Sequence, residues 1–276
     1  WVNIFFMIIN NLRKILKHRK SVSDNFTYPN FCLQASKDEK VFKTFRSQEI
    51  YQNILEHVNY DIAIKYFSLL KTEYNLKDIE IFKKIEKLNE IGSPELVQVS
   101  KEIPKVSSTG LRYLFTGLEI KTFLEKNNLP SKKIVELGCG YGGQSIILGD
   151  LLEVEEYTYI DLEEVNELIK KFLSNFKINF STNFNTLDSK DFQKNDLFIS
   201  NYSFSELPKN LQKKALSKVI KNSNSGFMII NSENFSKEYK FMTKQEYKNL
   251  FNNYEISEEK PQTSHDNLNY VYKFIN

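Results

Sequence analysis

The second half of the chain alternates between short apolar runs and longer stretches with helical periodicity. The apolar runs predict strands at residues 132–138, 156–161, 177–182, 196–201 and 226–231. The stretches after them predict helices at residues 142–152, 163–175, 208–222 and 243–252. Strands that alternate with helices in this way are typical of an α/β fold with a doubly wound, mostly parallel, Rossmann-like sheet.

The end of the chain departs from this alternation. Residues 254–259 and 269–275 both have the pattern of a strand, and only the segment KPQTSHDNL lies between them. So short a connection joins two antiparallel strands, because a parallel pair needs a longer crossover. We therefore expect a seven-stranded sheet whose last strand runs against the others.

The first third of the chain has a different, helical character. Residues 21–45 are rich in Ser, Asn, Asp and Lys and predict a loop, and apolar faces predict helices at residues 48–58, 61–73 and 76–89. Gly92, Pro94 and Pro104 then predict a linker, and Ser107 to Thr109 can cap a helix over residues 110–126. We interpret residues 1–105 as an N-terminal helical region that forms a lid, and residues 106–276 as the second domain.

Composition and charge narrow the classes of function. Of the 276 residues 41% are hydrophobic, which is ample for a packed core, and the net charge is only +3. Basic and acidic residues are mixed along the chain, so no basic stripe indicates a nucleic-acid partner. The two cysteines, Cys32 and Cys139, suggest neither a disulfide framework nor a zinc site, which favours a cytoplasmic location.

The N-terminal segment WVNIFFMIINNLRKILKHRK has an apolar part followed by a basic part. The apolar part is too short to span a bilayer, and the order is opposite to that of a signal peptide. Three interpretations remain open, namely weak association with a membrane surface, a docking helix and a disordered leader.

The sequence KKIVELGCGYGGQS at residues 132–145 carries the main chemical signal. Gly138, Gly140, Gly142 and Gly143 follow a strand and precede a helix, which lets the backbone and the helix N-terminus approach a ligand closely. A plain structural turn is one alternative, and Gly138, Gly140 and Gly143 also satisfy the spacing of an NAD-binding loop. Two cofactors therefore compete, NAD and S-adenosylmethionine (SAM). Asp161 after the next strand suits the ribose hydroxyls of both. Glu136 before the loop and the closing antiparallel strand favour SAM.

The residues just past each strand define the expected site, because ligands bind at the carboxyl ends of strands in an open α/β sheet. At this edge, His265 and Glu206 are the candidate catalytic bases that could remove the proton of an acceptor hydroxyl. The structural alternative for His265 is an exposed loop histidine, and that for Glu206 is a cap or ion pair of the following helix. Asp161, Glu163, Glu206, Glu233 and Asp266 are loop acids on the same face, but no ligand spacing singles them out and we predict no metal site. The segment after strand 196–201 lacks the two prolines of methyltransferases that act on nucleic-acid bases, which disfavours that activity.

Several sequence blocks resemble the bacterial sugar O-methyltransferase family, which depends on SAM. They are IGSP at 91–94, LRYL at 111–114, VELGCGYGGQS at 135–145, YIDLEEV at 159–165, SNYSFSELP at 200–208, GFMIIN at 226–231 and the terminal SHDNLNYVY. The resemblance runs from about residue 90 to the end, and residues 1–90 have no counterpart. One departure is Cys139, where the family pattern leads us to expect glycine.

The resemblance implies methylation of a sugar hydroxyl, on a nucleotide sugar or on a glycan precursor of a surface polysaccharide such as a capsule. The residues assigned to the cofactor are Glu136, Gly138, Cys139, Gly140, Tyr141, Gly142, Gln144, Asp161, Leu162 and Asn201, and those assigned to the acceptor are Tyr202, Asn231 and Arg112. A methyl acceptor that is not a sugar, an NAD-dependent sugar oxidoreductase and a non-catalytic binding module remain open, as does a homodimer.

Overall fold

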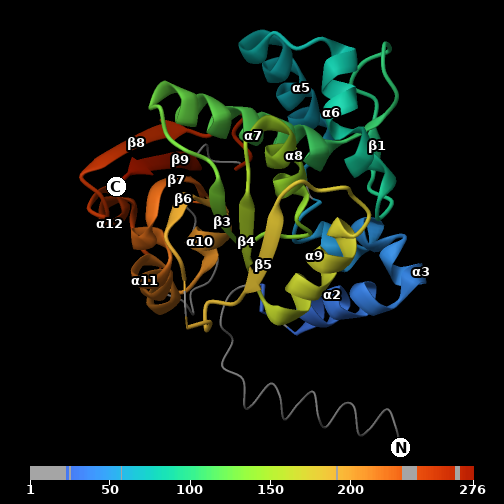
Figure 1. Ribbon diagram of the computed structural model, residues 1–276. Coiled ribbons are helices and arrows are strands. Elements are labelled where there is room, and N and C mark those ends of the chain that lie inside the picture. The colour runs from blue at the N-terminus through green and yellow to red at the C-terminus, as the bar shows by residue number, and fades with distance from the viewer. Residues whose placement is uncertain (1–22, 25, 57, 191, 232–240, 265–267) are drawn as a thin grey trace, which may run out of the picture.

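One seven-stranded sheet forms the centre of the molecule (Figure 1). The computed structural model describes residues 23–24, 26–56, 58–190, 192–231, 241–264 and 268–276. The strand order is β5-β4-β3-β6-β7-β9-β8, and β9 runs antiparallel to both of its neighbours. The strands are β3 (Lys133–Leu137), β4 (Glu156–Ile160), β5 (Ser181–Asn185), β6 (Asn195–Asn201), β7 (Ser223–Ile230), β8 (Asn253–Glu258) and β9 (Tyr270–Ile275). The predicted fold, a mostly parallel sheet with an antiparallel last strand, is confirmed.

Helices cover both faces of the sheet. Side chains alternate between the faces, so that in β3 Ile134 belongs to one apolar core while Val135 and Leu137 belong to the other. The first core lies beneath α7 (Ser108–Lys126), α8 (Gly143–Leu151) and α9 (Glu163–Leu173). The second lies beneath α10 (Ser203–Glu206), α11 (Lys209–Lys218), the short η2 (Ile220–Asn222) and α12 (Lys244–Lys248).

The chain reverses its direction across the sheet between β3 and β6. It leaves β3 for β4 and then β5 on one side, and returns to place β6 against the other edge of β3. The loops after β3 and β6 therefore leave in opposite directions, and a crevice opens between them at the carboxyl ends of the strands. This is where ligands bind in open α/β sheets.

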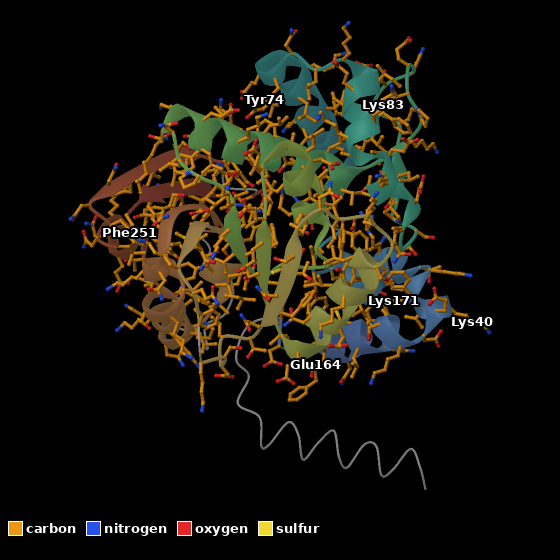
Figure 2. The ribbon with its side chains drawn as sticks, in the orientation of Figure 1. Lys40, Tyr74, Lys83, Glu164, Lys171 and Phe251 are labelled. Carbon is orange, nitrogen blue, oxygen red and sulfur yellow. The ribbon has the colours of Figure 1, made fainter. Side chains whose placement is uncertain are left out.

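The N-terminal helices pack against the helices on the first face. They are α2 (Thr27–Lys37), α3 (Glu39–Phe42), η1 (Phe45–Ser47), α4 (Glu49–Gln52), α5 (Tyr60–Tyr74) and α6 (Asp78–Glu90). Figure 1 shows α2 alongside α9, and Figure 2 shows Lys171 of α9 on the side of α3, where it forms an ion pair with Glu39 at 2.7 Å. α5 and α6 pack on α7, and a two-stranded antiparallel sheet of β1 (Leu96–Val97) and β2 (Val106–Ser107) leads into that helix. Buried residues of both regions join one continuous core; the domain boundary at residue 105 stays a prediction.

The prediction of a loop over residues 21–45 was wrong. This segment forms α2 and α3, and Pro29 is tolerated because it lies in the first turn of α2, where its missing N–H is not needed. Tyr28, Cys32 and Ala35 give α2 a buried face against the core. The Ser107 cap of α7 is confirmed, since its side chain accepts a hydrogen bond from the N–H of Gly110 at 3.2 Å.

Several other element boundaries differ from the prediction. The helix expected at 48–58 is only α4, because the chain then turns and places Glu56 against the buried Arg46. The strand expected at 177–182 is displaced toward the C-terminus: β5 begins at Ser181, which pairs with Glu156. As an edge strand with many polar residues, β5 lacks a clear apolar run. The helices expected at 208–222 and 243–252 end at Lys218 and Lys248.

Candidate functional site

The glycine loop joins β3 to α8 at the predicted crevice. Gly138 and Gly140 have φ angles of +77° and +59°, in the left-handed region that side chains other than glycine rarely adopt. A Cβ atom on Gly138 would lie 2.0 Å from the Oγ of Ser203, so the first turn of α10 packs directly on the loop. A Cβ atom on Gly140 would lie 2.7 Å from a methyl carbon of Leu55, in the segment after α4. Neighbouring segments therefore approach the backbone as closely as only glycine permits.

Asp161 follows β4 and holds the glycine loop. Its two carboxylate oxygens accept hydrogen bonds from the backbone N–H groups of Cys139, at 2.7 Å, and of Leu162, at 2.8 Å. Burial raises the pKa of this carboxyl from 3.8 to about 6. Each carboxylate oxygen can accept more than one hydrogen bond, so Asp161 retains capacity for donors of a ligand.

A cavity of about 310 Å³ lies beside Asp161. This volume is at the lower end of the range of about 300–1,000 Å³ that is usual for small-molecule sites. Its lining comes from the carboxyl ends of β3, β4 and β5, from α10 and α11, and from the segment before α2: Ser23, Asp24, Leu137, Gly138, Ile160, Asp161, Leu162, Glu163, Glu164, Thr186, Leu187, Asp188, Ser203, Glu206, Leu207 and Leu211. Six of these residues are acidic, and the described lining contains no Lys, Arg or His. The described lining therefore has an acidic character, with the charge of Asp188 offset by an ion pair with Lys214 and the pKa of Asp161 and Glu206 raised by burial.

Sequence reasoning missed the contribution of β5 to this cavity. Thr186, Leu187 and Asp188 follow the strand and line the cavity, and Asp188 also forms an ion pair with Lys214 of α11. The signal that could have located them is a two-residue repeat, in which Phe180, Thr182 and Phe184 share one face of a strand. This repeat places β5 later in the sequence than the apolar residues at 177–182 do. The acidic Asp24, which lies before α2, had no such signal.

Four residues assigned to the cofactor lie in the packing around the glycine loop. Glu136 is 2% exposed, and its Oε2 accepts a hydrogen bond from the Tyr157 hydroxyl at 2.7 Å; burial raises its pKa to about 8. Tyr141 is enclosed by aromatic rings, and the Arg46 guanidinium lies 4.6 Å from its ring centroid. Gln144 donates to the Tyr113 carbonyl at 3.1 Å, and the thiol of Cys139 faces the Glu136 carbonyl at 3.1 Å. All four side chains are buried.

Asn201 is the last residue of β6 and Tyr202 follows it, next to the glycine loop. The Oδ1 atom of Asn201 is buried and has no hydrogen-bond partner within the described part of the chain. Tyr202 has a φ angle of +69°, a strained value for a residue with a side chain, and its hydroxyl donates to the carboxylate of Glu259. Glu259 is 3% exposed and also accepts hydrogen bonds from Thr263 and Asn269 of the loop between β8 and β9. This network fixes the phenol of Tyr202 against the closing hairpin.

Glu206 and Asn231 form a pair at the ends of α10 and β7. The Nδ2 of Asn231 donates to Oε1 of Glu206 at 2.8 Å, and the Asn231 N–H donates to the Oγ of Ser205 at 3.1 Å. Burial raises the pKa of Glu206 to about 7, and the hydrogen bond from Asn231 opposes this shift. Glu206 lines the same cavity as Asp161, which brings together two of the predicted site residues.

Arg112 lies in α7 and is 6% exposed. Its guanidinium donates to the Leu55 carbonyl at 3.2 Å and lies 5.7 Å from the ring centroids of both Tyr113 and Tyr202. It forms no ion pair with any described residue. The predicted acceptor residues Arg112 and Tyr202 are thus neighbours.

Some of the predicted site residues lie outside the part of the chain that the structure describes. His265, the other candidate base, lies outside the described residues, as do Glu233 and Asp266. Among the described residues no group of three or more His, Cys, Asp or Glu side chains is arranged to hold a metal ion. None of the helices within those residues is long and apolar enough to cross a membrane.

Comparisons with known proteins give distant structural matches only. No family model and no curated protein matches the sequence. Similar solved structures include magnesium protoporphyrin IX methyltransferase (ChlM) from Synechocystis PCC 6803 with bound SAM, with 14% identity, a TM-score of 0.47 and coverage of 79% of this chain and 99% of that chain. They also include the N-methyltransferase NodS from Bradyrhizobium japonicum WM9, with 14% identity, a TM-score of 0.44 and coverage of 58% and 95%. The mitomycin 7-O-methyltransferase MmcR gives 10% identity, a TM-score of 0.44 and coverage of 62% and 56%. The fold assignment rests on the strand order of this chain.

Proposed function

We propose that this protein is a SAM-dependent O-methyltransferase that acts on a hydroxyl of a sugar, on a nucleotide sugar or on a precursor of a surface glycan. The observation that carries the choice of cofactor is the acidic cavity at the ends of β3, β4 and β5. SAM is a nucleoside with a positively charged sulfonium, and its ribose hydroxyls and adenine amine are hydrogen-bond donors. Carboxylates suit all three features, because they attract the charge and accept the donors.

The same observation argues against the NAD alternative. The two phosphates of NAD carry negative charge, and such groups are bound by helix N-termini, backbone N–H groups or cationic side chains. The described lining offers no cation to bind them, and its ionised carboxylates, among them Asp161, would repel them. We therefore do not propose an oxidoreductase.

The chain offers a consistent set of roles around SAM. Asp161 would accept the ribose hydroxyls while it keeps the N–H of Cys139, and Asp188 would accept the adenine amine at the end of β5. Leu162 and Leu207 supply apolar surface to the same cavity. Gly138, Gly140 and Gly142 would let the backbone approach the amino-acid end of the cofactor. When bound, SAM supplies a methyl group already activated by the sulfonium.

The remaining task of the protein is to align the acceptor and to remove its proton. Glu206 is one candidate base, because a carboxyl with a pKa of about 7 can take up a proton near neutral pH. His265 is the other, from its place in the sequence between β8 and β9. Tyr202 and Asn231 would border the acceptor hydroxyl. The sugar as acceptor rests on the resemblance of the sequence blocks, above all of SNYSFSELP at residues 200–208.

The proposal is tested in two stages with the full chain. Calorimetric titration with SAM, S-adenosylhomocysteine (SAH) and NAD should give micromolar binding of the first two only, and Asp161→Ala should abolish it. Nucleotide sugars are then screened for uptake of label from SAM carrying a tritiated methyl group. Binding of NAD alone would refute the cofactor, and binding of SAM with transfer only to acceptors other than sugars would refute the sugar. Binding of none of the three would favour a non-catalytic module.

A further inference from the structure

The buried Arg112 is unusual because its charge has no carboxylate partner among the residues that the structure describes. Taking a guanidinium out of water is costly, and buried arginines in proteins are normally paired. Arg112 is 6% exposed, yet its contacts are one backbone carbonyl, that of Leu55 at 3.2 Å, and two tyrosine rings. A guanidinium has five N–H donors, so most of its capacity is unused within the described residues.

The neighbouring acids are already engaged by other groups. Glu56 is ion-paired with Arg46 and accepts a hydrogen bond from Thr109 at 2.8 Å. Glu259 accepts hydrogen bonds from Tyr202 and from the closing hairpin loop. Neither lies within ion-pair distance of Arg112. The local packing thus engages the nearby carboxylates with other groups and leaves the Arg112 guanidinium without an ion pair in the described part of the chain.

The position of Arg112 connects it with the proposed active site. The Leu55 residue that accepts its hydrogen bond also places its side chain on Gly140 of the glycine loop. On the other side, Arg112 faces the ring of Tyr202, the residue with strained backbone at the end of β6. Arg112 does not line the cavity beside Asp161. Its guanidinium lies between Leu55, which packs on the glycine loop, and the ring of Tyr202, which follows β6 near the point where the chain reverses direction across the sheet and a ligand is expected.

We propose that Arg112 binds an anionic oxygen group, a carboxylate or a phosphate, of a ligand held between the glycine loop and Tyr202. The planar fork of a guanidinium matches both groups with two parallel hydrogen bonds. This inference rests on the proposed function, in which two molecules can supply such a group. One is the amino-acid end of SAM, and the other is the phosphate of a nucleotide-sugar acceptor.

The test is calorimetric and uses wild-type protein and Arg112→Gln. The ligands are SAH, 5′-methylthioadenosine, which lacks the amino-acid end, and UDP added to SAH-saturated protein. If the group is the cofactor carboxylate, Arg112→Gln weakens SAH at least tenfold and leaves methylthioadenosine unchanged. If it is an acceptor phosphate, SAH binding is unchanged and UDP binding falls at least tenfold. Arg112→Lys should recover only part of the loss, because an ammonium lacks the fork.

Stability provides an independent readout with Arg46 as the matched control. Arg46 is also buried, with 0% exposure against 6% for Arg112, but it is ion-paired. Arg46→Gln should therefore lower the urea midpoint of unfolding, whereas Arg112→Gln should leave it unchanged or raise it. The proposal is overturned if Arg112→Gln binds all ligands like wild type, or if it weakens SAH and methylthioadenosine equally. If wild-type protein fails to bind SAH, the proposed function and this inference both fall.

Discussion

The contact between the glycine loop and α10 allows a quantitative test with Gly138→Ala. Two costs can be worked out separately. The backbone at Gly138 has a φ angle of +77°, and forcing an alanine into the left-handed region costs about 1–2 kcal/mol. The new Cβ would also lie 2.0 Å from the Oγ and 2.1 Å from the Cβ of Ser203, an overlap that costs about 1–3 kcal/mol to relieve. The total loss of unfolding free energy should be about 2–5 kcal/mol.

A double-mutant cycle separates these two costs. Ser203→Gly removes both overlapping atoms and leaves the Ser203 Cα position at 3.6 Å from the new Cβ, which is ordinary contact. Alone, Ser203→Gly should cost about 0.5–1 kcal/mol, because glycine lowers helix stability. Combined with Gly138→Ala, it should recover the steric part and retain the backbone part. The two substitutions should therefore couple by about 1–3 kcal/mol.

The assay is urea unfolding of the four proteins, followed by fluorescence or circular dichroism at equilibrium. SAH titration of the same proteins then asks whether the loop keeps its shape. Additive effects, with a coupling below about 0.5 kcal/mol, would refute the packing of Ser203 on the loop. A loss for Gly138→Ala below about 1 kcal/mol would refute the left-handed backbone as well.

Three further predictions concern the charges around the site. Burial raises the pKa of Glu136 to about 8, so folding disfavours its charged form and wild-type stability should fall as the pH rises from 5 to 8. Glu136→Gln should flatten this decline when Tm is measured by calorimetry at each pH. Parallel Tm-against-pH curves for the two proteins would contradict the prediction. Asp188→Ala should weaken the binding of SAH about tenfold in calorimetric titration. Lys214→Ala removes only the ion-pair partner of Asp188 and should change SAH affinity less than twofold. Equal effects of the two substitutions would argue against a direct contact between Asp188 and SAH. Glu259→Ala leaves the hydrogen-bond donors of Tyr202, Thr263 and Asn269 without their acceptor, and it should lower the free energy of unfolding in urea by about 1–3 kcal/mol. No change would mean that this hydrogen-bond network does not contribute to stability.

The sheet was predictable because its strands carry strong local signals. The apolar runs after residue 132 and the short connection before residue 269 were enough to predict a parallel sheet with an antiparallel last strand. Strand β5 was the exception, since an edge strand needs little apolar surface and its polar residues hide the pattern. Its displacement concealed Asp188 from the predicted site.

Other features depend on packing between distant segments and leave no local signal. The glycine loop and Asp161 were found from sequence because their spacing is local to one βαβ unit. That Asp24 lines the cavity follows from where α2 docks on α9, which no pattern near residue 24 encodes. In the same way the sequence shows an arginine at position 112 but cannot show that it forms no ion pair with the described residues, because pairing depends on where Glu56 and Glu259 are placed in three dimensions.

The position of β9 between β7 and β8 has a consequence for how the sheet assembles. β8 comes first in the sequence, yet among the described strands its one neighbour in the sheet is β9, so β8 cannot join the sheet before β9 is there to pair with it. β8 therefore joins either together with β9 as a hairpin or after β9 has paired with β7, and in both routes the edge of β7 is closed only when β9 docks on it. Until then β7, an eight-residue and almost fully buried strand, presents an open hydrogen-bonding edge to other chains. Substitutions that delay the docking of β9 should therefore appear first as aggregation during refolding, even where the folded protein loses little stability.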